Sequence, residues 1–188
     1  MKVESFNIEV KSLSWGTEEI LLRFDAKEIS FSATYMGLEP ISSLIYSLVS
    51  LEHEIDNEDF TRYKFAWCDE PGTLDFEIHK ANYNDYILVR IKYDNCASDP
   101  YHKNDDWEFE MHYSLYRKTI LEAALKVLNK YGLNGFSDSW ADGKDTFPLC
   151  SLVSLLGAKS TYQKDGDCYC SDIFKELTLL KDSINKMS

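Results

Sequence analysis

Glycine is scarce in this chain, and the short sequence motifs of common catalytic and cofactor-binding sites are missing. Its 188 residues include only 8 glycines, and none forms the G-x-G-x-x-G or G-x-x-x-x-G-K-[ST] loops that hold phosphates. The sequence also lacks the G-x-S-x-G elbow of hydrolases and the H-E-x-x-H spacing of zinc proteases. We therefore expect no cofactor and no metal. The pattern favours a protein that is not an enzyme, without excluding one.

Cysteine pairs and long apolar runs are also missing. The five cysteines are an odd number and form no C-x-x-C pair, so neither a disulfide framework nor a zinc knuckle is indicated. No apolar run approaches the roughly 20 residues of a membrane span, and residues 1–4 lack an apolar signal core. These absences predict a cytoplasmic protein that does not enter a membrane.

Basic residues are outnumbered by acidic ones. The chain has 20 Lys and Arg against 32 Asp and Glu, a net charge of −12. Nucleic acids are held mainly by Lys and Arg, so the charge disfavours a nucleic-acid-binding protein, and it disfavours anionic membrane surfaces in the same way. An acidic surface can instead steer a basic protein partner toward it. The charge does not indicate an oligomeric state.

Alternation of apolar and polar residues dominates the central third of the chain. Four segments have this period of two, at 63–67, 74–78, 87–93 and 107–113, and three earlier ones lie at 6–10, 20–24 and 29–35. A period of two with one polar face predicts antiparallel strands. We expect Glu70 to Thr73 to form a type II turn, with Gly72 at positive φ.

Helical periodicity separates and follows the strands. Apolar residues recur every three or four positions at 39–51, 114–131, 149–156 and 171–186, the last with Phe174 on its apolar side. Gly132 suits the end of the second helix, so we predict a loop at 134–147 and a polar connection at 157–169. The expected fold is α+β, a mostly antiparallel sheet of about six to seven strands with helices packed on one face. Residues 1–188 are expected to form a single domain.

Two segments are candidates for binding a partner. One is the acidic stretch after the first helix, and the other is the loop after Gly132, where aromatic residues stand among acids. The candidate residues are Glu52, Glu54, Asp56, Glu58, Asp59, Phe136, Asp138, Trp140, Asp142 and Asp145. Aromatic side chains dominate binding hot spots, and acids suit a basic partner. Solvated loops are the alternative, with Trp140 folded inward.

The polar face of the central strands is a second kind of candidate. An alternative pocket or metal site would use Glu77, His79, Glu110 and His112. Carboxylates and imidazoles can perform acid–base chemistry or bind a metal. Lys64, Arg90 and Lys92 belong to the same face, however, and ordinary cross-strand ion pairs would explain the charges equally well.

One segment carries a resemblance to a known group of proteins. Residues 65–72, with the sequence FAWCDEPG, are followed by an alternating strand. This arrangement resembles small bacterial proteins of the kind that includes immunity proteins encoded beside polymorphic toxins. The resemblance covers the central third of the chain and transfers no site residue. It implies a non-catalytic protein that binds and neutralises a toxin. A small-molecule-binding domain or enzyme with a sheet and helix pocket, and a structural module, remain as alternatives.

Overall fold

The four central alternating segments and the first residues of the chain form one hydrogen-bonded sheet. In the computed structural model, the described residues are 1–14, 17–34, 39–53, 62–69, 72–81, 85–95, 106–139, 147–155, 163–165, 168–170 and 173–186. A five-stranded sheet has the order β1-β8-β7-β6-β5. Its strands are β1 (Lys2–Val3), β5 (Arg62–Asp69), β6 (Gly72–Lys80), β7 (Tyr86–Asn95) and β8 (Asp106–His112). All neighbours pair antiparallel except β1, which is parallel to β8.

The three earlier segments form a separate antiparallel sheet. Its strands are β2 (Phe6–Ser14), β3 (Thr17–Phe24) and β4 (Lys27–Thr34), in the order β2-β3-β4. Asp25 opens the two-residue turn between β3 and β4 with a positive φ of 51°. Its carboxylate accepts hydrogen bonds from the amides of Glu4 and Ser5, at 3.1 and 2.9 Å, which fixes the chain entering β2.

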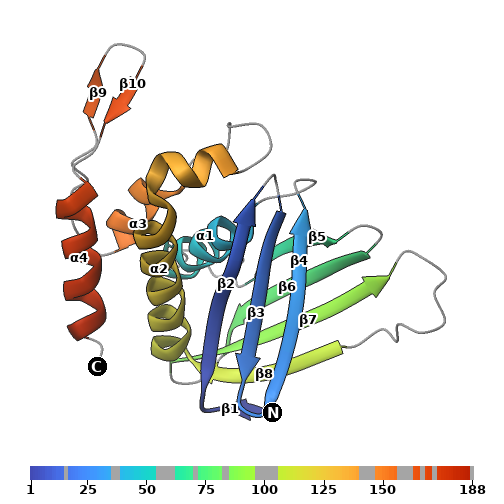
Figure 1. Cartoon of the computed structure of the whole chain (residues 1–188). Helices are drawn as coiled ribbons and strands as arrows, with labels where there is room; N and C mark the ends of the chain where they lie inside the picture. Colours follow the sequence, from blue (N-terminus) through green and yellow to red (C-terminus); the bar gives the residue numbers. More distant parts are fainter. Residues whose placement is uncertain are drawn as a thin grey trace.

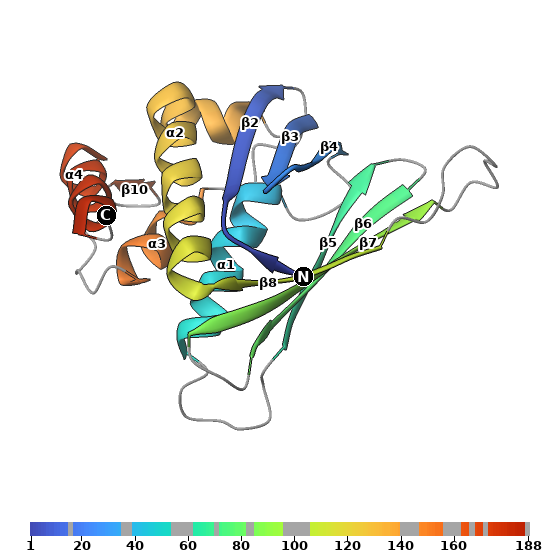
Figure 2. The same cartoon turned by 90° about the horizontal axis from the view of Figure 1, so that it is seen from below.

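The α+β class is confirmed, but the expected single sheet of six to seven strands is wrong. The two sheets lie across each other (Figures 1 and 2). Buried apolar side chains of both sheets belong to one core. Phe24 of β3 stacks on Phe109 of β8 with ring centroids 4.6 Å apart, and both side chains are fully buried. Alternation shows which side of a strand is apolar but not which strands share hydrogen bonds, because a sheet and a pair of facing sheets have the same pattern.

Helices complete the cover of the apolar side. They are α1 (Pro40–His53), α2 (Tyr113–Ser139), α3 (Leu149–Leu155) and α4 (Ile173–Lys186). Glu39 caps α1, and Pro40 takes its first position. The predicted stripe of α1 is buried, at Ile41, Leu44, Ile45, Leu48 and Leu51.

Along α2, the Thr119 hydroxyl donates to the Phe6 carbonyl and Lys130 Nζ to the Lys11 carbonyl, so α2 covers the edge of β2. No described helix has the length and hydropathy needed to cross a membrane.

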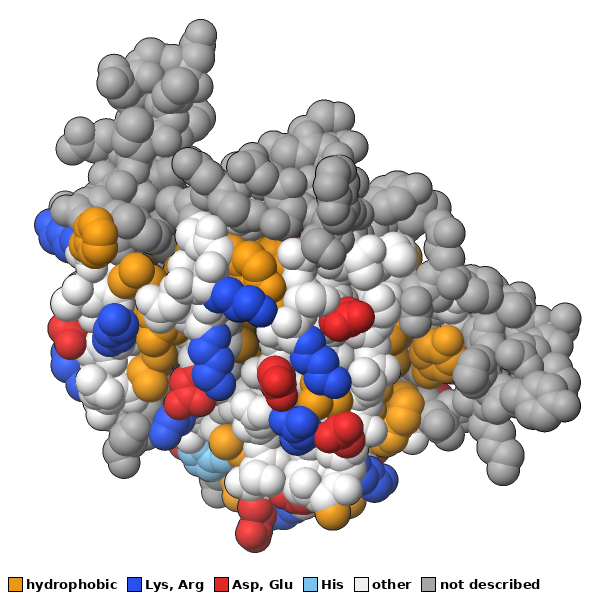
Figure 3. Space-filling view, viewed as in Figure 1, with side chains coloured by type: hydrophobic (Ala, Val, Ile, Leu, Met, Phe, Trp, Pro, Cys, Tyr) orange, Lys and Arg blue, Asp and Glu red, His pale blue; other side chains and the backbone are white. Residues whose placement is uncertain are grey.

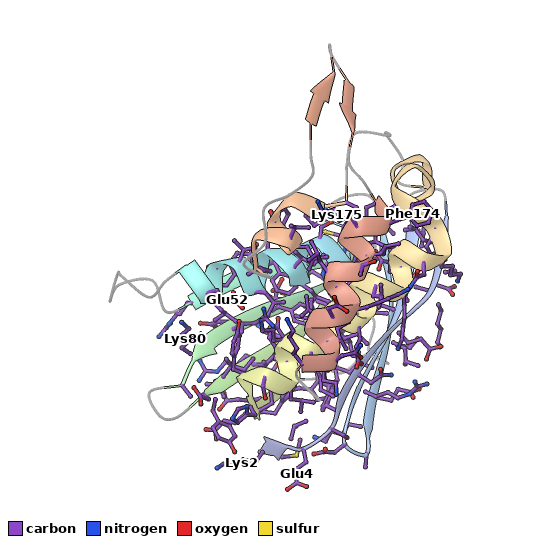
Figure 4. All side chains as sticks on the ribbon, turned by 90° about the vertical axis from the view of Figure 1, so that its left-hand side faces the viewer. Lys2, Glu4, Glu52, Lys80, Phe174 and Lys175 are labelled. Atoms are coloured by element: carbon purple, nitrogen blue, oxygen red, sulfur yellow. The ribbon has the colours of Figure 1, made fainter. Side chains whose placement is uncertain are left out.

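Four local predictions need correction. Gly132 has the predicted positive φ of 68°, but helical structure resumes after it and runs to Ser139, so the first part of the predicted loop is wrong. Residues 163–165 and 168–170 pair as a hairpin, β9 (Gln163–Asp165) and β10 (Cys168–Cys170), where a connection was expected. Phe174, at the start of α4, is 81% exposed rather than packed (Figure 4).

Gly72 is the fourth correction, since it is the first residue of β6 and does not have positive φ. A Cβ there would lie 2.8 Å from the Tyr93 hydroxyl and 3.1 Å from the Asp94 carbonyl. The close approach of β7 therefore favours glycine here, and no turn is involved.

Candidate functional site

The outer face of the five-stranded sheet is hollowed. We define this outer face by the side chains that point away from the helices and the second sheet: Arg62, Lys64, Ala66, Asp75, Glu77, His79, Leu88, Arg90, Lys92, Asp106, Glu108, Glu110 and His112. The described helices and the second sheet lie on the opposite side (Figure 2). A hollow of about 590 Å³ lies over β5 to β8. A large concave surface of this kind is where binding is expected.

Three successive rows of the strand register form the lining of the hollow. We call Lys64, Glu77, Arg90 and Glu108 the paired row, and Ala66, Asp75, Lys92 and Asp106 the open row. Phe65, Phe76, Ile91 and Trp107, which lie between these rows, complete the lining. Each row crosses four strands. The signs run along the strands, with acids on β6 and β8 and bases on β7 between them. The hollow therefore presents a basic stripe flanked by two acidic stripes.

The paired row neutralises itself. Arg90 Nε lies 2.6 Å from Glu108 Oε2, and Lys64 Nζ lies 3.7 Å from Glu77 Oε1. The side chains of Lys64, Arg90 and Glu108 are between 45% and 65% exposed, so water screens these pairs and they add little stability. This is the ordinary cross-strand pairing that the sequence allowed.

The open row differs. Asp75, Lys92 and Asp106 are all exposed, and no described residue lies within ion-pair or hydrogen-bond distance of their charged groups. Lys92 has an aspartate on each side in the register, but the short aspartate side chains do not reach it. The open row thus leaves two acids and one base for contacts with another molecule.

Glu77 and His79 come together, as the alternative pocket or metal site required. His79 Nε2 lies 2.8 Å from Glu77 Oε1, but the direction of approach does not give a hydrogen bond. Burial lowers the pKa of the His79 imidazole, and the nearby Glu77 carboxylate opposes that shift. The pKa of Glu77 lies below its usual range: burial raises it, but His79, Lys64 and Arg62 outweigh that effect. The lowered pKa of His79 favours the neutral imidazole, so this contact beside the hollow is not a full ion pair.

Glu110 and His112 do not join that pair. Glu110 lies on β8 beside Leu88 and Lys2 in the register, and His112 Nδ1 is 2.7 Å from the Ser114 hydroxyl. No three His, Cys, Asp or Glu side chains of the described part of the chain are arranged to hold a metal ion. Of the four residues of the alternative pocket or metal site, only Glu77 lines the hollow.

One residue of the predicted partner-binding loop lies in the core. Phe136 is fully buried and packs edge-on against Phe147, with ring centroids 5.3 Å apart, so it cannot anchor a partner. Asp138 lies in the last turns of α2, and its side chain is outside the described part. Trp140, Asp142 and Asp145 also lie outside the described residues.

Glu52, the first acid of the acidic stretch, is engaged within the protein. Its Oε1 accepts a hydrogen bond from the Tyr113 hydroxyl at 2.6 Å and from Arg117 Nε at 2.8 Å. It lies near the end of α1, facing α2 (Figure 4). Burial, then the bond to Glu52, raises the pKa of the Tyr113 hydroxyl, which stays protonated and donates. Glu54, Asp56, Glu58 and Asp59 lie outside the described residues.

The open row is the feature that sequence reasoning missed. Alternation places Lys92 on the polar face, but the contrast between neighbouring rows depends on register, which the sequence alone does not give. Comparison with protein-family models, with curated proteins and with solved structures finds no match to the chain. The assignment of the candidate site therefore rests on the geometry of the described residues alone.

Proposed function

We propose that this protein is a non-catalytic binding protein that holds a protein partner against the outer face of its five-stranded sheet. The observation that carries the proposal is the hollow of about 590 Å³, with the unpaired charges of the open row on its floor. Unpaired charges at a concave surface can each gain a partner on binding without losing one within the protein. Scattered ion pairs on the other sheet offer no such gain (Figure 3).

The specific form of the proposal is an immunity-type protein that acts in the cytoplasm and neutralises a basic toxin. The net charge of −12 supports it, because an acidic protein associates rapidly with a basic one. The two acidic stripes on β6 and β8 would meet basic side chains of the toxin, and Lys92 between them would meet an acid or a carbonyl. The resemblance of residues 65–72 to immunity proteins points the same way.

The test is binding to the product of the neighbouring gene, with charge reversal on the outer face. We expect Asp75→Lys with Asp106→Lys to weaken binding about tenfold or more, since like charges would then oppose the basic partner. The matched control is Glu19→Lys with Glu28→Lys, which reverses two exposed acids on the three-stranded sheet. Equal loss in both double variants would assign the effect to net charge alone. Absence of any complex would remove the immunity-type reading.

A small-molecule-binding domain is the second candidate, favoured by the volume of the hollow. A cavity of about 590 Å³ falls within the range of roughly 300–1,000 Å³ typical of ligand sites. Seven of the twelve residues that line the hollow are charged, however, whereas ligand sites place only a few polar groups in their lining. A metabolite that raises the melting temperature of the wild type, but not of Asp75→Lys with Asp106→Lys, would favour this candidate.

A further inference from the structure

Two carboxyl groups are enclosed where the three-stranded sheet meets the start of α1. Glu18, the second residue of β3, is 0% exposed, and Glu39, the residue before Pro40, is 1% exposed. Glu18 takes an inward position of β3, in series with buried Ile20 and Leu22. A carboxylate in such a place normally has a cation beside it or carries a proton. The question is therefore which of the two, a cation or a proton, balances the charge of this buried pair.

The two carboxyl groups have unequal surroundings. Glu39 Oε1 accepts a hydrogen bond from the Ile41 amide at 2.8 Å, and Glu39 Oε2 accepts one from the Ser42 amide at 2.7 Å. Both amides belong to the first turn of α1, whose dipole favours a negative charge there. Neither oxygen of Glu18 has a hydrogen-bond donor among the described residues. The site therefore stabilises an anion on Glu39 and a neutral acid on Glu18.

No described cation compensates Glu18. Its register partners are Leu13 on β2 and Ala33 on β4, and α1 presents only amides and serine hydroxyls. Within the described part, Glu39 is the one titratable group that faces it. Burial, and then the charge of Glu39, raises the pKa of the Glu18 carboxyl well above its usual range. Burial also raises the pKa of Glu39, but its interactions with Glu18, Ser42 and the Ile41 amide oppose that shift.

We propose that Glu18 and Glu39 share one proton, carried on Glu18, and that this proton latches β3 to the start of α1. In this arrangement the Glu18 hydroxyl donates a hydrogen bond to the Glu39 carboxylate. With the proton gone, no donor joins the two groups, and two anions face each other away from water. This repulsion destabilises the contact between β3 and the start of α1, and separation of the two elements would relieve it.

The direction of the pH dependence follows from proton counting. A glutamate of the unfolded chain loses its proton near pH 4.3, as an approximate value, whereas the folded pair keeps one to higher pH. In the interval between these two pKa values the folded state binds more protons, so stability falls as pH rises. The contribution is complete below the unfolded pKa and is lost as pH rises through the folded pKa of the pair, which titrates as a unit.

A bound cation is the other way to balance two carboxylates, and the geometry argues against it. Amides already occupy both oxygens of Glu39, and the start of a helix repels positive charge. No described third His, Cys, Asp or Glu completes a ligand set around the pair. The proton is the smaller and better-placed charge.

The experiment compares unfolding of three proteins by urea between about pH 5 and pH 9. They are the wild type, Glu18→Gln, and Glu19→Gln, which changes the next residue on the exposed side of β3. Glutamine keeps the shape of Glu18 and can donate to Glu39 at every pH. We expect the folding constant of the wild type to fall by up to about tenfold per pH unit relative to Glu18→Gln, because one proton is involved. Glu19→Gln should follow the wild type, and three parallel curves would overturn the proposal.

Infrared spectroscopy provides a reading that does not depend on stability. The carbonyl band of a protonated carboxylic acid should be present at neutral pH in the wild type and in Glu19→Gln, and missing in Glu18→Gln. If Glu18→Gln does not fold, absence of the band from the folded wild type at neutral pH still refutes the shared proton. Added Mg²⁺ or Ca²⁺ should leave stability unchanged. Stabilisation by either ion that depends on Glu18 would replace the proton with a metal and overturn the proposal.

Discussion

The stacked pair of Phe24 and Phe109 joins the two sheets, and its removal should show how tightly they depend on each other. Both side chains are fully buried, with ring planes 20° apart and centroids at 4.6 Å. Leucine keeps each position apolar but is smaller than phenylalanine by roughly one methylene, so each single substitution should cost about 0.5–1.5 kcal/mol for the lost volume in addition to the lost stacking. Stacked aromatic pairs contribute about 0.5–1.5 kcal/mol beyond the area they bury. The double variant should therefore lose less stability than the sum of the singles, by about that amount.

Urea unfolding of the wild type, the two single variants and the double variant measures this coupling. The control cycle pairs Phe109→Leu with Phe136→Leu, because Phe136 packs against Phe147 and has no stacking contact with Phe109. Its two effects should add within about 0.5 kcal/mol. Additivity in the cycle of Phe24 and Phe109 as well would refute the face-to-face contact of β3 and β8 and, with it, the placement of the outer face on the far side.

Two further substitutions test the supports of the fold by the same denaturation assay. Arg117→Ala should destabilise by about 1.5–3 kcal/mol, because Arg117 bonds Glu52 and the Leu155 carbonyl while only 18% of its side chain is exposed. The exposed ion pairs of Arg23 with Glu9 and Glu28 should make Arg23→Ala far milder, and equal losses would contradict this reading. Gly132→Ala should cost about 1–3 kcal/mol through its φ of 68° and ψ of −178° alone, since no atom lies within 4 Å of the added Cβ. A neutral result there would contradict the kink in α2.

The sides of the central strands could be predicted from the sequence almost residue by residue. Leu74, Phe76 and Ile78 are buried, whereas Asp75, between Leu74 and Phe76, is exposed, as a period of two requires. The hydrophobic effect acts locally here, because each apolar side chain decides its own side of the strand.

The partition into two sheets could not be predicted, because pairing is a long-range choice. Phe24 and Phe109 are 85 positions apart in the chain, and the sequence around either residue gives no sign of its contact with the other. The end of α2 was mispredicted for a related reason. Gly132 has the backbone of a helix end, but Phe136 continues beyond it to bury against Phe147. Tertiary packing there outweighs the local signal.

Only those features of the candidate site that follow from local sequence patterns could be predicted. The polar face of β5 to β8 follows from alternation, whereas the difference between its paired row and its open row follows from register. Glu52 shows the same limit, since the acid that suggested a solvated surface is held by Arg117, 65 positions away. Alternation predicts that the second strand begins at Ile20, and this places Glu18 outside it, whereas β3 begins at Thr17. An acid in series with buried residues was the available signal.

Carboxyl footprinting of the complex with the neighbouring gene product tests the central claim most directly. Asp75 and Asp106 should be modified in the free protein, where both are exposed, and protected in the complex. Glu19 and Glu28 on the three-stranded sheet should react equally in both states. Protection of Glu19 and Glu28 with continued reaction of Asp75 and Asp106 would contradict the assignment of the outer face as the binding surface.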